Sequence, residues 1–270
     1  MTREPVPVFV YHSVSADPPS WIAPFTVTPR VFAEQLTLLQ DSGLTVVPLR
    51  DLVAALYGGP PVPPRSAVLT FDDGFADFRT TVAPLLAERE LPATLYVTTD
   101  ALREPVAAAD GASRFPPAAM LTWREVVELD SMGVEIGGHS RTHPQLDALP
   151  RHRVREEIEG CREQLQDVLG HRVDSFAYPH GYSSPAVRRA VGAAGFTSAA
   201  AVRDGFSSDA DEPLRIARLM VRADTGRKRF LSWTGGAGAR VAPFDEGPRT
   251  RAWRTYRRLR AAVNRPYTAC

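Results

Sequence analysis

The chain has 270 residues, which is long enough for one large domain with a buried hydrophobic core. Its hydrophobic fraction of 44% and charged fraction of 23% are those of an ordinary soluble globular protein, and its net charge of +1 gives no general attraction to nucleic acid. Cys161 and Cys270 lack the paired spacing of metal-binding cysteines, which excludes a zinc site built from cysteine.

The N-terminal segment carries no recognisable targeting signal. Residues 1–7 lack the apolar core of a secretory signal peptide. No apolar run in the chain approaches the roughly 20 residues that a membrane-spanning helix needs. We therefore expect a cytoplasmic protein without a transmembrane segment.

Strands and helices are predicted to alternate along the chain. Short apolar runs predict strands, of which residues 6–11 form the first. The later predicted strands are 46–49, 67–71, 93–97, 134–136, 175–178, 199–202 and 216–221. The predicted helices are one that begins at Pro29, followed by 52–56, 75–89, 123–129, 151–169 and 185–194. This alternation indicates an α/β fold with a parallel sheet. Residues 103–120 interrupt it as an irregular segment that either walls a site or is a plain excursion.

Three of these helices begin with a recognisable capping residue. Thr28 and Ser184 each stand before a proline, which is the preferred residue at the first helical position. Thr122 is followed three residues later by Glu125, which is the spacing of a capping box. These signals fix where the helices start.

Two adjacent carboxylates, Asp72 and Asp73, come directly after the strand predicted at 67–71. Successive side chains at a strand end point in different directions, so one Asp can hold a metal ion while its neighbour faces a bound water. Neighbouring carboxylates also repel each other unless they share a cation or a proton. Asp-Asp-Gly on its own is equally a common turn sequence, so the pair needs support from elsewhere in the chain.

That support comes from His139 and His143, which follow the strand predicted at 134–136. If both lie on one helical turn, their imidazoles share a face and the spacing suits one metal ion. Two ordinary surface histidines are the alternative. Together with one of the two aspartates, they would make three ligands and leave positions open for water and substrate.

Four ordered motifs resemble those of the polysaccharide deacetylases, the NodB-homology group of carbohydrate esterases. They are Thr-Phe-Asp-Asp-Gly at 70–74, His-Ser-Arg-Thr-His-Pro at 139–144, Tyr-Pro-His-Gly at 178–181 and, near the N-terminus, Tyr-His-Ser-Val at 11–14. The last is similar to the Tyr-His-x-Val opening of the exopolysaccharide deacetylase branch. The resemblance implies a distorted (β/α) barrel with about seven parallel strands instead of the regular eight. We expect residues 1–235 to form it.

The resemblance also implies a metal centre and a base. Asp73, His139 and His143 would hold one divalent cation, for which zinc is the usual choice and cobalt, nickel and iron are compatible. The cation would bind the attacking water and polarise the acetyl carbonyl. Asp72 would take the proton of this water as general base.

Three further roles follow from the resemblance. His12 would protonate the leaving amine, because the chain has no Leu-x-His motif near its C-terminus, where more common members carry this acid. The backbone N–H of His180 would be an oxyanion donor, since it occupies the non-proline position of its motif. Arg218 would orient the catalytic Asp, because Ala177 stands where the more common third motif has an Arg.

The implied activity is removal of an N-acetyl group from an amino sugar, such as an N-acetylglucosamine glycoside or conjugate. Hydrolysis of a cyclic amide, of the allantoinase or imidase kind, would use the same residues and is the main alternative. An iron-dependent oxygenase also uses two histidines and one carboxylate, but Asp72 has no role there. A non-catalytic sugar-binding module should lack one of the catalytic groups, yet all are present.

The C-terminal segment, residues 236–270, differs from the rest of the chain. It carries eight arginines against two acidic residues. Trp253, Tyr256, Leu259 and Val263 could line one face of a basic helix. We expect either a basic tail, a helix packed on the barrel, or a peripheral membrane contact through residues 240–265.

Overall fold

The structure is a computed structural model that describes residues 4–102, 116–245 and 247–263. Most of the segment predicted to be irregular at 103–120 lies outside these residues, as does Cys270. Among the described residues, no helix combines the length and the apolar character that crossing a lipid bilayer requires.

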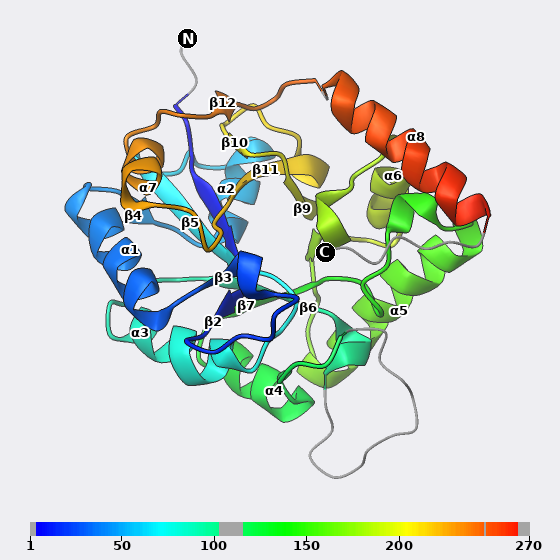
Figure 1. The fold of residues 1–270 in the computed structure, drawn as a ribbon, viewed down its shortest axis with the longest axis horizontal. Helices are drawn as coiled ribbons and strands as arrows, with labels where there is room; N and C mark the ends of the chain where they lie inside the picture. The colour runs from blue at the N-terminus through cyan, green and yellow to red at the C-terminus, as the bar shows by residue number, and fades with distance from the viewer. Residues whose placement is uncertain (1–3, 103–115, 246, 264–270) are drawn as a thin grey trace.

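Seven parallel strands form a closed barrel, and helices surround it (Figure 1). The strands are β1 (Val8–Tyr11), β5 (Ser66–Phe71), β6 (Thr94–Val97), β7 (Glu135–Gly138), β8 (Ser175–Ala177), β9 (Ser198–Val202) and β11 (Ile216–Met220). Their order is β1-β11-β9-β8-β7-β6-β5, and the pairing of β1 with β5 closes the ring. The prediction of a distorted barrel with about seven parallel strands is therefore confirmed.

Among the described residues, five short strands lie outside the ring. β4 (Thr45–Val46) pairs with the start of β5, β2 (Ser13–Val14) pairs with β3 (Thr26–Val27), and β10 (Gly205–Phe206) pairs with β12 (Arg240–Val241). Two-residue strands are too short to produce a periodic pattern, so four of them were not predicted. The strand predicted at 46–49 was placed too late, because the chain already turns into a helix at Leu49.

Eight α-helices in the described part of the chain cover the barrel. They are α1 (Pro29–Asp41), α2 (Leu49–Leu56), α3 (Ala83–Ala87), α4 (Trp123–Ser131), α5 (Arg151–Leu169), α6 (Pro185–Ala193), α7 (Arg227–Thr234) and α8 (Pro248–Ala262). The predicted caps form: Thr28 accepts from the Val31 N–H, Ser184 caps α6, and Thr122 makes a complete capping box. The predicted bounds of α5 agree with the structure.

The helix predicted at 75–89 is shorter than expected. It starts with a π-helical turn, Phe78–Val82, and only then continues as α3. Pro84 has no N–H to donate to the carbonyl four residues earlier, which removes one α-helical hydrogen bond at this junction.

The barrel interior changes from apolar to polar along its axis. Near the amino ends of the strands it is filled by a cluster that includes Val68, Ala200 and Ile216. Toward the carboxyl ends, Thr70 and Arg218 occupy the interior and are hydrogen-bonded to each other. The charged groups are thus concentrated at the carboxyl ends of the strands, where barrels of this kind carry their active sites.

Candidate active site

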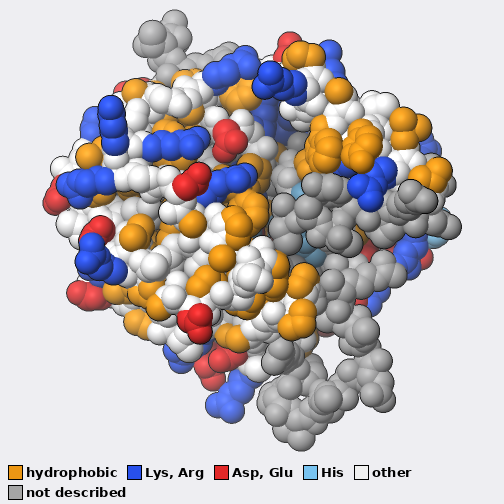
Figure 2. All heavy atoms as spheres, viewed as in Figure 1, with side chains coloured by type: hydrophobic (Ala, Val, Ile, Leu, Met, Phe, Trp, Pro, Cys, Tyr) orange, Lys and Arg blue, Asp and Glu red, His pale blue; other side chains and the backbone are white. Residues whose placement is uncertain are grey.

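A cavity of about 990 Å³ opens at the carboxyl ends of the barrel strands. It receives side chains from the segments that follow β1, β5, β7 and β8. The predicted site residues that line it are His12, Asp72, Asp73, His139, His143 and His180. Figure 2 shows parts of histidine side chains, in pale blue, on this face of the molecule.

Asp73, His139 and His143 lie together and could hold one metal ion. The Asp73 Oδ1 atom is 3.3 Å from His139 Nε2 and 3.4 Å from His143 Nε2. This oxygen is buried and has no hydrogen-bond partner among the described residues. Two ligands bound tetrahedrally to zinc at about 2.0–2.1 Å are roughly 3.3 Å apart, so the observed spacing fits such an ion.

The backbone after β5 makes the two neighbouring carboxylates diverge. Asp73 has a φ of 78° and Gly74 a φ of 90°, both in the left-handed region. The Gly74 N–H donates to the carbonyl of Asp72 at 3.1 Å, which closes this tight turn. Gly adopts such a φ without strain, and Asp tolerates it better than most residues.

The two histidines do not lie on one helical turn, so that prediction is wrong. Ser140 and His143 have φ values of 63° and 56°, which no right-handed helix contains. The Ser140 hydroxyl accepts from the His143 N–H at 3.0 Å. Glu157, buried on α5, accepts from the Thr142 N–H at 2.8 Å and from its hydroxyl at 2.6 Å. These side-chain acceptors replace helical hydrogen bonds and still direct His139 and His143 to one point.

The ring of His139 is held in one orientation by a neighbouring strand. Its Nδ1 atom is 2.8 Å from the carbonyl oxygen of Ala177, and the side chain is 2% exposed. A proton on Nδ1 donated to this carbonyl leaves the lone pair of Nε2 free to face Asp73. Fixing the tautomer in this way is typical of metal-binding histidines.

Asp72 and Arg218 form a buried bidentate ion pair. The Nη1–Oδ1 and Nη2–Oδ2 distances are both 2.7 Å, and the Arg218 side chain is fully buried. Burial by itself raises the pKa of Asp72, but the charge and the hydrogen bonds of Arg218 outweigh it and lower the pKa below its ordinary value. Asp72 is therefore ionised at neutral pH.

His12 reaches the cavity from the end of β1. Its Nδ1 atom is buried and has no hydrogen-bond partner within the described part of the chain. Burial lowers the pKa of His12, although the charges of Asp73 and Asp72 oppose this. The resting imidazole is therefore neutral at pH 7, and one nitrogen can bond to a bound substrate.

His180 contributes its ring as well as its backbone. The prediction considered only its N–H, but the imidazole lies 4.5 Å from the ring of His143 at an interplanar angle of 56° and stacks on the ring of Tyr182 at 5.8 Å. Its φ of 57° is left-handed. Burial is the main reason why the pKa of His180 is lowered to about 4.

Helix α8 supplies a wall of the cavity that the sequence did not predict. Arg257 forms a bidentate pair with Asp147 at 2.6 and 2.9 Å, and both side chains are buried. Trp253 donates its indole N–H to the Tyr182 hydroxyl at 2.9 Å. The four residues expected on one apolar face of this helix do not share one environment. Trp253 lines the cavity, whereas Tyr256 and Leu259 are 44% and 65% exposed. A membrane contact through this exposed side stays a prediction.

Residues 59–199 match the sequence profile described as polysaccharide deacetylase. The chain belongs to the polysaccharide deacetylase family. The matched region contains three of the four motifs and leaves out His12 and Arg218, which lie on either side of it. The family membership therefore covers the candidate metal ligands and Asp72, but the assignments of His12 and Arg218 depend on geometry.

A curated relative and two solved structures are similar to this chain. The poly-beta-1,6-N-acetyl-D-glucosamine N-deacetylase of Escherichia coli K12 is 40% identical over 60 residues, which are 22% of this chain and only 9% of that protein. The structure of IcaB from Ammonifex degensii has a TM-score of 0.73 at 22% identity and covers 86% of this chain and 97% of its own. The Streptococcus pyogenes deacetylase PplD, in complex with acetate, has a TM-score of 0.72 at 22% identity, with 86% and 98% covered. The two structures establish the barrel fold.

Replacement of Arg218 by Ala should destabilise the protein strongly. It would leave the Asp72 carboxylate buried without its partner, which typically costs about 3–5 kcal/mol. Arg218→Lys keeps the charge but loses the two parallel hydrogen bonds, so its loss should be smaller. Denaturant unfolding of the two variants and the wild type measures this. A loss below about 1 kcal/mol for Arg218→Ala would contradict the buried ion pair.

His180 should make the metal-free protein less stable as the pH falls. Its pKa is about 4 in the folded state and about 6.5 in an unfolded chain. Between these values the unfolded state binds more protons, so the free energy of unfolding decreases toward acid by up to about 1.4 kcal/mol per pH unit. Urea unfolding from pH 7 to 4.5 should show a shallower decrease for His180→Asn than for the wild type. Equal slopes would show that the ring titrates alike in both states.

Proposed function

We propose that this protein is a metal-dependent N-deacetylase that hydrolyses the N-acetyl group of an amino sugar, such as an N-acetylglucosamine glycoside or conjugate. The observation that carries the proposal is the buried Asp73–His139–His143 cluster beside an ionised Asp72, in a chain of the polysaccharide deacetylase family. The E. coli relative, which acts on a polymer of N-acetylglucosamine by its name, supports the substrate class. No observation favours the cyclic-amide alternative.

Asp73, His139 and His143 would hold the cation. Zinc is the usual ion for this set of donors, and cobalt, nickel or iron would also fit. When bound, the ion would polarise the acetyl carbonyl and lower the pKa of a bound water molecule to about 7. The unpartnered Asp73 Oδ1 and the fixed ring of His139 are the features of this chain that prepare the site for it.

Asp72 would act as the general base. It is ionised at neutral pH and lies at the end of the strand that also supplies Asp73. The two hydrogen bonds from Arg218 fix the plane of its carboxylate, so that one face stays directed to the cavity. The proton of the attacking water would pass to this carboxylate while the oxygen bonds to the acetyl carbon.

His12 would protonate the leaving nitrogen, and His180 would stabilise the oxyanion. His12 has a buried ring nitrogen without a partner among the described residues, which suits a group that bonds to substrate. Because its resting ring is neutral, His12 must gain a proton before the carbon–nitrogen bond breaks, and Asp72 can supply the one taken from water. The backbone N–H of His180 would donate to the developing oxyanion.

Removal of the metal should abolish acetate release, and zinc should restore it. The assay uses wild-type protein, a panel of N-acetylglucosamine glycosides and conjugates, and a chelated sample. Asp73→Asn is the matched variant, because it should bind metal poorly and lose activity even with added zinc. Acetate release that persists in protein shown to contain no metal would contradict the proposal.

Asp72→Asn should keep the metal and lose at least about 100-fold in kcat, because one general base contributes about that much. Asn keeps the shape and removes the basic oxygen, so metal content measured on the purified variant serves as the control. Turnover like that of the wild type would refute the assignment of Asp72 as the base.

A further inference from the structure

We infer that helix α8 holds the metal centre in its geometry and that Arg257 is a positioning residue for His143 and His180. This inference rests on the proposed metal site. It concerns the C-terminal segment, for which the sequence predicts a basic tail or helix. Its basis is a continuous set of contacts from α8 to the candidate metal ligands.

The first contact is made by Asp147, which lies four residues after His143 in a short 3-10 helix, Leu146–Ala148. Three arginines on one face of α8 reach it. Arg257 binds both carboxylate oxygens, Arg254 Nε lies 3.6 Å from Oδ2, and Arg258 Nε donates to the backbone carbonyl at 3.0 Å. The Asp147 side chain is fully buried. The position of the segment after His143 is therefore set by α8.

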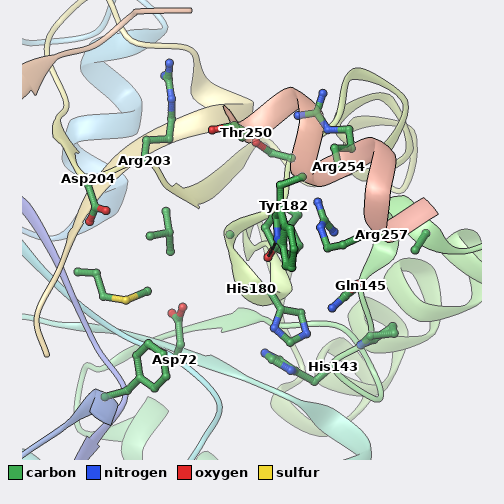
Figure 3. Close-up of a pocket in the computed structure, with 18 of the residues that line it drawn as sticks. Asp72, His143, Gln145, His180, Tyr182, Arg203, Asp204, Thr250, Arg254 and Arg257 are labelled. Atoms are coloured by element: carbon green, nitrogen blue, oxygen red, sulfur yellow. Dashed lines mark hydrogen bonds between the residues drawn. The ribbon is translucent and has the colours of Figure 1, made fainter. Parts of the chain in front are cut away.

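The second contact is a row of neighbouring rings that leads from the Arg257 guanidinium to the candidate ligand His143. The Arg257 guanidinium carbon lies 3.3 Å from the centre of the Tyr182 ring. That ring is stacked on His180 at 5.8 Å and an interplanar angle of 26°, and His180 lies 4.5 Å from His143. Figure 3 shows Arg257, Tyr182, His180 and His143 following one another along the wall of the cavity.

Arg257 thus holds two loops at once. Through Asp147 it fixes the loop that carries His143, and through Tyr182 it fixes the loop that carries His180. Both histidines have left-handed backbone conformations, at φ values of 56° and 57°, and such conformations persist only where the surroundings enforce them. The guanidinium on α8 is one such constraint, so its removal should loosen the metal ligand without removing any ligand atom.

The test measures metal affinity, which a purely structural role of α8 would not change. Zinc affinity is determined by competition with a chromophoric chelator, and the absorption spectrum of the cobalt-loaded protein reports the ligand geometry. Arg257→Ala should bind zinc about 10- to 100-fold more weakly, as expected for groups that orient metal ligands. Its cobalt spectrum should differ from that of the wild type. Arg257→Lys should recover part of the affinity by restoring the charge at Asp147.

Two further variants keep the result interpretable. Arg251→Ala is the matched control, because Arg251 is an exposed arginine on the same helix and does not line the cavity. It should bind zinc like the wild type. Tyr182→Leu interrupts the row of rings but leaves Asp147 paired, so it should weaken zinc binding even if Arg257→Ala fails to fold.

Two outcomes overturn different claims. The inference is wrong, and α8 is only structural, if the wild-type protein binds zinc and folded Arg257→Ala binds it equally well. If Arg257→Ala does not fold, the same conclusion follows from Tyr182→Leu binding zinc as tightly as the wild type. If wild-type protein binds neither zinc nor cobalt, the proposed function itself fails.

Discussion

A buried ion pair between Arg218 and Asp72 governs the carboxyl end of this barrel. The two residues come from β11 and from the end of β5, which both border β1. A carboxylate at this depth would normally become neutral, because burial disfavours its charge. The guanidinium reverses that preference and also fills the barrel interior above the ring of Tyr96, at 5.6 Å from its centre. The Arg218 side chain therefore fills the barrel interior, compensates the charge of Asp72 and orients its carboxylate.

Backbone strain is concentrated around the same point. Asp73, Ser140, His143 and His180 all have positive φ values, and three of them are candidate metal or oxyanion groups. Each such residue costs of order 1 kcal/mol or more, so the rest of the fold must compensate. Here the compensation is specific: the Ser140 hydroxyl accepts from the His143 N–H, and Glu157 accepts from the neighbouring backbone. The loops are held in place by side chains and not by secondary structure.

Local features of this fold could be predicted from the sequence, whereas its long-range pairs could not. The capping box at Thr122 and the bounds of α5 depend only on near neighbours, and both agree with the structure. The turn between His139 and His143 could not be predicted, because Glu157 on α5 determines its shape. The partner of Asp72 lies 146 residues away, and only a family resemblance pointed to Arg218. Nothing in the sequence pattern connects Arg257 with Asp147, so the contribution of α8 to the cavity was missed.

The position of β1 has a consequence for how the chain is made. Of the barrel strands, β1 is synthesised before the others, and one of its edges stays open until β11 has been synthesised, because β1 pairs with β5 on one side and β11 on the other. Until β11 has been synthesised, the nascent chain therefore carries an unpaired strand edge together with an Asp72 that has no guanidinium of Arg218 beside it. The barrel closes and the Asp72 carboxylate gains its ion-pair partner in the same step, because β11 brings both the missing strand and Arg218.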